Sequence, residues 1–212
     1  MHESRFPRRA AAIAAAALAA CATTASAGGG PLGIDHRIGY DDSGIWARSN
    51  QKALAAGVIA FEAGGALWLG ADDAFGRTLW QTVDASVASG IAAQVAKYAF
   101  GRERPSQTDD PNRWFKGTCC QSFPSGEVTL QASFVTPIIV NYHAEHPWVW
   151  ALEALPLYDG IARMKTWGHW QTDVLAGWAL GTAFGYYATR REEPFFVSIL
   201  PGSITAGISK TF

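Results

Sequence analysis

Five long apolar-rich segments, separated by helix-breaking residues, place the strongest constraint on the fold of this chain. In each segment apolar residues recur at helical spacing over several turns. The breaks between segments fall at Gly70, at the stretch from Gly101 to Pro111, at Pro147 and at Gly168. We therefore predict an all-α helical bundle with helices over residues 47–69, 78–100, 125–143, 147–164 and 168–188.

Polar residues within these segments argue against a multi-pass membrane protein. A membrane span needs about 20 consecutive apolar residues. Glu62, Gln94, Gln131, Asp159 and Asp173 each interrupt one of the five segments. A bundle with an apolar interior fits this pattern better, and the nine Trp residues suit packing more than lipid anchoring.

The first 27 residues have the pattern of an export signal. Basic residues from Arg5 to Arg9 precede an apolar run over residues 10–20. The mature protein is therefore expected in the periplasm or otherwise exported.

Two processing routes stay open for this signal. The sequence ending at Cys21 resembles a lipoprotein box, which would make Cys21 a lipid anchor. A site of the A-x-A type ends instead at Ala27, with Gly28 as the new first residue. Cys119 and Cys120 are adjacent, and they form either a strained vicinal disulfide, a bond to another molecule, or two idle thiols.

The remaining layout follows from the loss of helical periodicity at both ends. Residues 28–46 are predicted to form an extended arm, and residues 47–190 the helical domain. Within residues 191–212, two alternating runs flank Pro201-Gly202-Ser203 and predict a short β-hairpin. The formal net charge of −1 lacks the basic excess of a nucleic-acid binder, so that class is set aside.

Three short clusters carry the chemistry. They are K-x6-R-P (Lys97, Arg104, Pro105), P-S-G-E (Pro124, Ser125, Gly126, Glu127) and R-x5-H-x3-D (Arg163, His169, Asp173). Phosphoryl transfer needs positive charge around the phosphate oxygens, a nucleophile, and a proton for the leaving group. The clusters offer candidates for each.

The cations come from the first and third clusters. Lys97 and Arg104 lie two helical turns apart, so they share a face if the helix persists past Gly101 and stops at Pro105. Arg104 and Arg163 suit bidentate phosphate contacts, whereas Lys97 acts as a point charge.

The second cluster precedes a periodic apolar segment, which places Ser125 as a helix N-cap. Helix N-termini bind anions through unpaired N–H groups, and Gly126 would let a ligand approach the backbone closely. In the third cluster, the spacing of His169 and Asp173 lets the carboxylate reach one imidazole nitrogen.

The ordered triplet resembles the type 2 phosphatidic acid phosphatase superfamily, whose signature is K-x6-R-P, P-S-G-H and S-R-x5-H-x3-D. The resemblance covers roughly residues 78–188. It implies that Lys97, Arg104, Ser125, Gly126 and Arg163 bind phosphate. It also implies that His169 forms a phosphohistidine oriented by Asp173, without a metal or other cofactor.

Two departures from that signature matter. Ala162 replaces the serine beside Arg163, which removes one hydroxyl. Glu127 replaces the histidine that resembles the leaving-group acid, a contribution worth about 10²- to 10⁴-fold in rate. We hypothesise that Glu127 donates this proton when phosphate is bound, which predicts an acidic optimum.

The sequence thus predicts an exported phosphatase acting on a phosphomonoester or diphosphate, either a lipid or a soluble compound. The alternative is a non-catalytic phosphate- or lipid-binding protein with a degenerate site. Expected ligands are phosphate or vanadate, no nucleic acid is expected to bind, and contact with a membrane surface is open. A haloperoxidase is disfavoured because it would also rely on the missing histidine.

Overall fold

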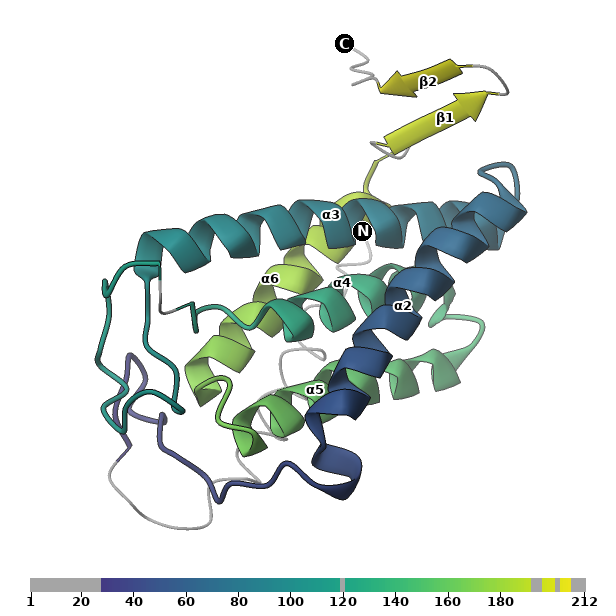
Figure 1. The fold of residues 1–212 in the computed structure, drawn as a ribbon. Helices are drawn as coiled ribbons and strands as arrows, with labels where there is room; N and C mark the ends of the chain where they lie inside the picture. Colours follow the sequence, from purple (N-terminus) through teal and green to yellow (C-terminus); the bar gives the residue numbers. More distant parts are fainter. Residues whose placement is uncertain (1–27, 119–120, 192–195, 201–202, 207–212) are drawn as a thin grey trace, which may run out of the picture.

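The computed structural model describes residues 28–118, 121–191, 196–200 and 203–206, and it is built from helices (Figure 1). All five predicted segments contain observed helices, which confirms the all-α class. The elements in chain order are η1 (Gly44–Trp46), α2 (Arg48–Leu69), α3 (Ala74–Phe100), α4 (Gly126–Tyr142), η2 (Pro147–Glu153), α5 (Ala154–Lys165), α6 (Gln171–Thr189), β1 (Phe196–Leu200) and β2 (Ser203–Ala206).

Helix boundaries follow local capping, and α3 ends where the predicted helix over residues 78–100 ends. The chain turns left-handed at Gly101 (φ 44°), so α3 ends at Phe100 and does not continue to Pro105. Its start is set by the Asp73 carboxylate, which accepts a hydrogen bond of 2.8 Å from the Gly76 N–H. Arg104 therefore lies in the loop after α3, not on the helix face that carries Lys97.

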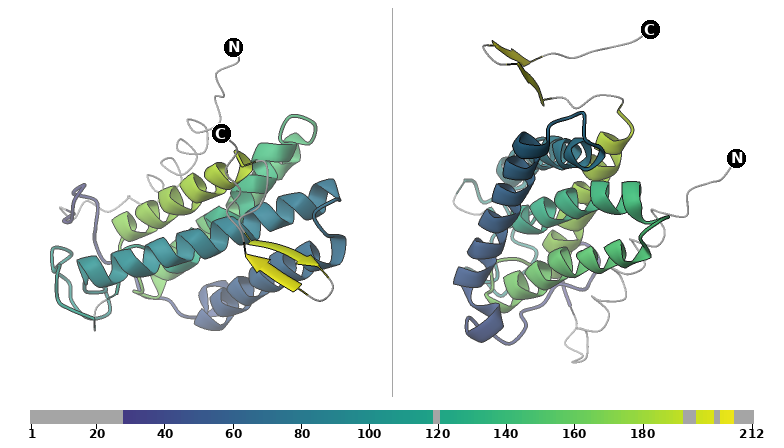
Figure 2. Two further views of the ribbon diagram at one scale, coloured as in Figure 1. Left: turned by 90° about the horizontal axis from the view of Figure 1, so that it is seen from above. Right: turned by 90° about the vertical axis from the view of Figure 1, so that its right-hand side faces the viewer.

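Helix α4 is the centre of the bundle, with α2, α3, α5 and α6 around it (Figures 1 and 2). A helix that is apolar on all sides belongs in the interior, and most of α4 is buried. One core cluster includes Phe134 and Ile139 of α4, and a second joins Val128 of α4 to Val174 and Trp178 of α6.

Glycines on α6 allow this helix to approach α4 closely. A Cβ atom at Gly177 would lie 2.4 Å from the Ser125 carbonyl oxygen, and one at Gly181 would lie 2.3 Å from the Thr129 carbonyl oxygen. Because only glycine fits at these positions, the spacing of α4 and α6 depends on them. This contact holds the beginnings of both helices side by side.

Several apolar side chains of α2 and α3 are exposed. They include Ile59, Leu67 and Trp68 of α2, with Ile91 and Val95 of α3. Among the described helices, α2 is the one that is long and apolar enough to cross a membrane, and only 17% of its most apolar window is buried.

Some predictions fall on residues that the structure does not describe. The export signal with Cys21 and the pair Cys119–Cys120 lie outside the described residues. Strands β1 and β2 pair antiparallel, with Leu200 opposite Ser203, but the residues that would connect them are not described. The C-terminal hairpin therefore stays a prediction.

We predict that Gly181→Ala lowers the free energy of unfolding by about 1–3 kcal/mol, because the added methyl forces α6 away from α4. Gly90→Ala on α3 is the matched control, since a Cβ there meets nothing within 4 Å. That control should be stabilised by about 0.5–1 kcal/mol through helix propensity. Urea denaturation measures both, and a Gly181→Ala protein as stable as wild type would contradict the close contact.

Candidate functional site

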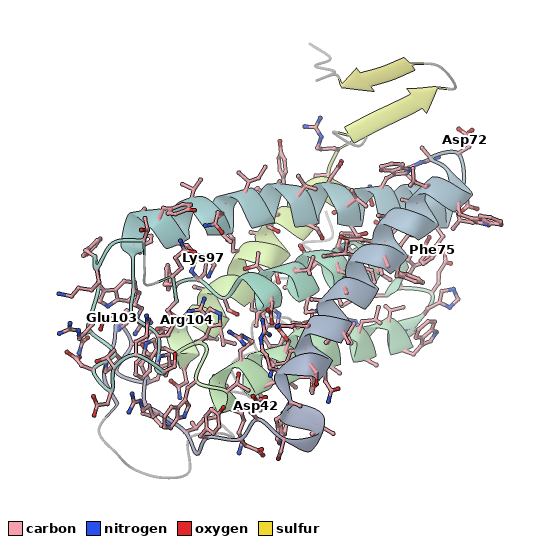
Figure 3. All side chains as sticks on the ribbon, viewed as in Figure 1. Asp42, Asp72, Phe75, Lys97, Glu103 and Arg104 are labelled. Atoms are coloured by element: carbon pink, nitrogen blue, oxygen red, sulfur yellow. The ribbon has the colours of Figure 1, made fainter. Side chains whose placement is uncertain are left out.

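The three sequence clusters meet at one end of the bundle, between α3, α4, α5 and α6. The side chains of Lys97 and Arg104 lie close together there (Figure 3), and both donate to the Gln121 carbonyl oxygen, at 3.0 and 3.1 Å. Although the two do not share a helix, the loop returns Arg104 to the end of α3. A backbone hydrogen bond of 2.9 Å from the Ser125 N–H to the Asp173 carbonyl oxygen joins the second cluster to the third.

Arg163 reaches the same place from the last turn of α5. Its guanidinium lies over Gly168, where a Cβ atom would be 2.1 Å from Nη2, so this passage requires glycine. Arg104 donates to the carbonyl oxygen of the same glycine, at 3.2 Å. Because the sequence predicts that they bind or attack a phosphate, we use the name phosphate pocket for the group Lys97, Arg104, Ser125, Arg163 and His169.

The cations of this pocket are crowded and partly dehydrated. Burial, together with the charges of Arg104 and Arg163, lowers the pKa of Lys97 to about 8. Burial also lowers the pKa of Arg163 to about 10, against the opposing charge of Glu127. An anion in the pocket would oppose both shifts, because an opposite charge favours the protonated form of each group.

Three buried polar atoms in the pocket have no hydrogen-bond partner among the described residues: Ser125 Oγ, Arg163 Nε and His169 Nδ1. Buried polar groups in native proteins are almost always paired. Ser125 is the N-cap of α4, as predicted, but its side chain makes no capping hydrogen bond. At Gly126 an added Cβ would meet only the Lys97 side chain, at an ordinary 3.6 Å, so no protein neighbour demands glycine there.

His169 lies just before α6, and its side chain is only 4% exposed. Burial, followed by the charges of Arg163, Lys97 and Arg104, holds the pKa of His169 well below its usual range. The imidazole is therefore neutral at physiological pH and has a lone pair available for attack.

Asp173 is held by groups other than His169. Its Oδ2 accepts from Ser122 Oγ at 2.5 Å and from the Trp170 N–H at 2.9 Å, and its Oδ1 pairs with Arg102 at 2.6 Å. The distance from His169 Nδ1 to Oδ2 is 3.8 Å, which is an ion-pair distance and not a hydrogen bond. The Asp173 carboxylate thus lies beside one imidazole nitrogen, as the spacing predicts, but forms no hydrogen bond with it in this structure.

Arg102 is a residue that the sequence analysis missed. It is fully buried and pairs with both Asp173 and Asp35, each at 2.6 Å. Its guanidinium also lies 4.3 Å from the centre of the Trp114 ring. A guanidinium can donate in several directions within one plane, which is why a single arginine can join the arm, α6 and the loop after α3.

Glu127 is paired with Arg48 at the start of α2, a second residue that the sequence analysis missed. Nη1 and Nη2 of Arg48 both donate to the Glu127 carboxylate, and the distance from Nη1 to Oε2 is 2.5 Å. Burial raises the pKa of Glu127, but the Arg48 hydrogen bonds and the charges of Arg163, Arg48 and Arg104 outweigh it, so the pKa is lowered. The carboxylate is therefore ionised when the pocket holds no phosphate.

Two further side chains surround this ion pair. The fully buried Gln51 accepts from Arg48 Nη1 at 2.9 Å and from Arg163 Nη1 at 3.1 Å. Asp159 is also fully buried, and neither of its carboxylate oxygens has a hydrogen-bond partner among the described residues. Burial and the charge of Glu127 raise its pKa to about 7. The described residues contain no group of three His, Cys, Asp or Glu side chains that could hold a metal.

Comparison with known proteins yields matches that include most of this site. The family model of the PAP2 superfamily matches residues 78–195. The chain is 29% identical over 117 residues to a lipid A 1-phosphatase of Porphyromonas gingivalis, covering 55% of this chain and 24% of that protein. A lipid A 1-phosphatase of Rhizobium johnstonii is 31% identical over 103 residues, which cover 46% of this chain and 41% of that protein. A lipid A 1-phosphatase of Rhizobium etli is 32% identical over 114 residues, which cover 51% of this chain and 47% of that protein.

The chain thus covers less than half the length of each of these three relatives. No solved structure matches it. Arg48, Gln51 and Asp35 all precede the segment matched by the family model.

Proposed function

Because the chain belongs to the PAP2 superfamily, we propose that it is an exported phosphatase that cleaves a phosphomonoester or diphosphate of a lipid through a phosphohistidine at His169. The observation that carries this proposal is that Ser125 Oγ, Arg163 Nε and His169 Nδ1 are all buried without a hydrogen-bond partner among the described residues. Two of these atoms belong to predicted phosphate ligands and the third to the predicted nucleophile. A tetrahedral phosphate would supply partners for Ser125 Oγ and Arg163 Nε, whereas Nδ1 of His169 faces Asp173 and leaves Nε2 for attack on phosphorus.

The proposed first step is attack on phosphorus by the neutral imidazole. Lys97, Arg104 and Arg163 balance the charge on the phosphate oxygens, and the N-terminus of α4 adds N–H donors. A bond forms between the imidazole nitrogen and phosphorus while the bond from phosphorus to the leaving oxygen breaks. Asp173, fixed by Arg102, lies 3.8 Å from Nδ1 and stabilises the positive charge that develops on the ring.

Glu127 is proposed to protonate the leaving oxygen. Its low pKa in the phosphate-free protein depends on the hydrogen bonds from Arg48. A phosphate that arrives with its own proton repels the Glu127 carboxylate, weakens that pairing and raises the pKa, so that the proton passes to Glu127 and then to the leaving group. In the second step the Glu127 carboxylate accepts a proton from the water that hydrolyses the phosphohistidine.

An apolar groove beside α2 supports a lipid substrate. It encloses about 530 Å³ and is lined almost entirely by apolar atoms, including Leu54, Val58 and Phe61 of α2 with Phe134 and Trp148. From Gln51, beside the pocket, to Phe61 in the groove, α2 rises about 15 Å. A phosphate head in the pocket and a hydrocarbon chain in the groove would therefore both contact α2.

The exposed apolar side chains of α2 and α3 support contact with a membrane surface, where such a lipid resides. Three relatives that carry the name lipid A 1-phosphatase support the same substrate class. The predicted export signal agrees with a site of action in the cell envelope.

The second candidate is a non-catalytic phosphate- or lipid-binding protein. The ionised Glu127, paired with Arg48, favours it because a deprotonated carboxylate cannot donate a proton. Phosphate binding is common to both candidates, so only turnover separates them.

We predict that His169→Ala abolishes release of inorganic phosphate while the fold, followed by circular dichroism, is retained. Wild-type protein quenched in acid-free denaturant after mixing with ³²P-labelled substrate should carry label on His169. His146→Ala, an exposed histidine outside the pocket, is the control and should keep wild-type turnover. Turnover near wild type in His169→Ala would overturn the phosphohistidine step.

We predict that Glu127→Gln lowers kcat for alkyl phosphates by about 10²-fold, as expected for loss of general acid catalysis. The loss for p-nitrophenyl phosphate should be much smaller, because that leaving group needs little protonation. Since Glu127 acts in its protonated form and its pKa is lowered, the wild-type rate on alkyl phosphates should fall as pH rises towards neutral, with a much flatter profile in the variant. Full activity of Glu127→Gln on alkyl phosphates at acidic pH would exclude this role.

We predict that kcat/KM rises with acyl chain length by up to about fourfold per methylene, because each buried CH₂ contributes about 0.8 kcal/mol. Gly57→Trp should abolish this rise by filling the groove and leave p-nitrophenyl phosphate turnover unchanged. The control is Gly64→Trp, two turns further along the same helix and outside the groove. An unchanged chain-length dependence in Gly57→Trp would show that the chain binds elsewhere.

A further inference from the structure

We propose that Arg48 is a fourth phosphate-binding cation, which the phosphate-free protein holds on Glu127 and which turns to the phosphate group when one enters the pocket. This proposal rests on phosphate binding in the pocket, as in the proposed function, but it does not require that the protein hydrolyses a substrate. Arg48 lies outside all three sequence clusters and outside the segment matched by the family model.

The guanidinium groups of Arg48 and Arg163 lie side by side. They share two acceptors: Gln51 Oε1, at 2.9 and 3.1 Å, and Glu127 Oε2, at 2.5 and 3.8 Å. Arg163 belongs to the pocket, and its Nε still lacks a hydrogen-bond partner among the described residues. An anion that satisfies this Nε would lie within a side chain's movement of Arg48.

Arg48 is also in a position to move. Its side chain is 31% exposed and that of Glu127 is 24% exposed, so the pair lies at the rim of the pocket, whereas Arg163 is 7% exposed. Burial is the main cause of the lowered pKa of Arg104 and Arg163, and the charge of Arg48 adds to it at both, which places Arg48 within electrostatic range of two pocket cations. Gln51 lies about one helical turn further along α2 and accepts a hydrogen bond of 2.9 Å from Arg48 Nη1, so it holds the guanidinium in the position seen in this structure.

Glu127 acts as a built-in counter-ion for these cations. With Asp173 paired to Arg102 and Asp159 buried with a pKa of about 7, Glu127 is the ionised carboxylate that Arg48 and Arg163 share. A phosphate and the Glu127 carboxylate then compete for the same guanidinium. Arg48 therefore compensates for a glutamate that would otherwise repel the ligand.

The test is calorimetric binding of inorganic phosphate, and separately of vanadate, to the full exported chain at fixed pH and low salt. The proteins are wild type, Glu127→Gln, Arg48→Gln and the double variant, each checked by thermal melting. Glu127→Gln should bind phosphate about tenfold more tightly, because the competing carboxylate is gone and Arg48 is released. In the Glu127→Gln background, Arg48→Gln should weaken binding by about ten- to hundredfold, the range for a hydrogen bond to a charged group.

Two controls separate direct contact between Arg48 and phosphate from the general effect of a positive charge near the pocket. Lys52→Gln removes the same charge one turn further along α2, at an exposed position, and should change affinity by less than about threefold. Arg48→Lys in the Glu127→Gln background keeps the charge without the planar donor fork, and should restore only part of the affinity. If Arg48 serves only to hold Glu127, then Arg48→Gln in the Glu127→Gln background will leave phosphate affinity unchanged, and the proposal is wrong. This result is independent of whether the protein turns over substrate.

Discussion

The buried guanidinium of Arg102 is the interaction on which the rest of the site depends. It joins Asp35 of the arm, Asp173 at the start of α6 and the loop that follows α3. Breaking such a buried pair leaves an uncompensated charge, at a typical loss of about 3–5 kcal/mol. The Asp173 carboxylate also accepts hydrogen bonds from the Trp170 N–H and from Ser122 Oγ. The same carboxylate therefore caps the start of α6 and fixes the segment that carries His169.

Close packing of α6 against α4 is the second interaction that positions the site. Gly177 and Gly181 bring α6 against the first turns of α4, so the N-terminus of α4 and His169 lie on one side of the bundle. The pocket is thus a consequence of two constraints of different kind. A buried charge network fixes the loops, and side-chain-free positions fix the helix spacing.

Electrostatic balance explains how the chain tolerates its departure from the signature. A glutamate in place of a histidine brings negative charge to the proposed phosphate site, which by itself would oppose phosphate binding. Arg48 and Arg163 neutralise it, and the neutral His169 remains available because burial and three neighbouring cations suppress its protonation. The charge balance around Glu127 and the protonation state of His169 therefore depend on the same group of buried cations.

The periodicity of the sequence was sufficient to predict the helices, because local spacing of apolar residues and breakers decides them. The three clusters were also recognisable, since a phosphate site needs particular residue types at short spacing. A helix face shared by Lys97 and Arg104 required the helix to continue past Gly101, and the left-handed turn there ends α3 first. The spacing predicted that Asp173 reaches His169, but it could not reveal that Arg102, Ser122 and Trp170 form the hydrogen bonds of that carboxylate. Only the tertiary structure paired Glu127 with Arg48, 79 residues away, because long-range ion pairs depend on helix packing and leave no local pattern.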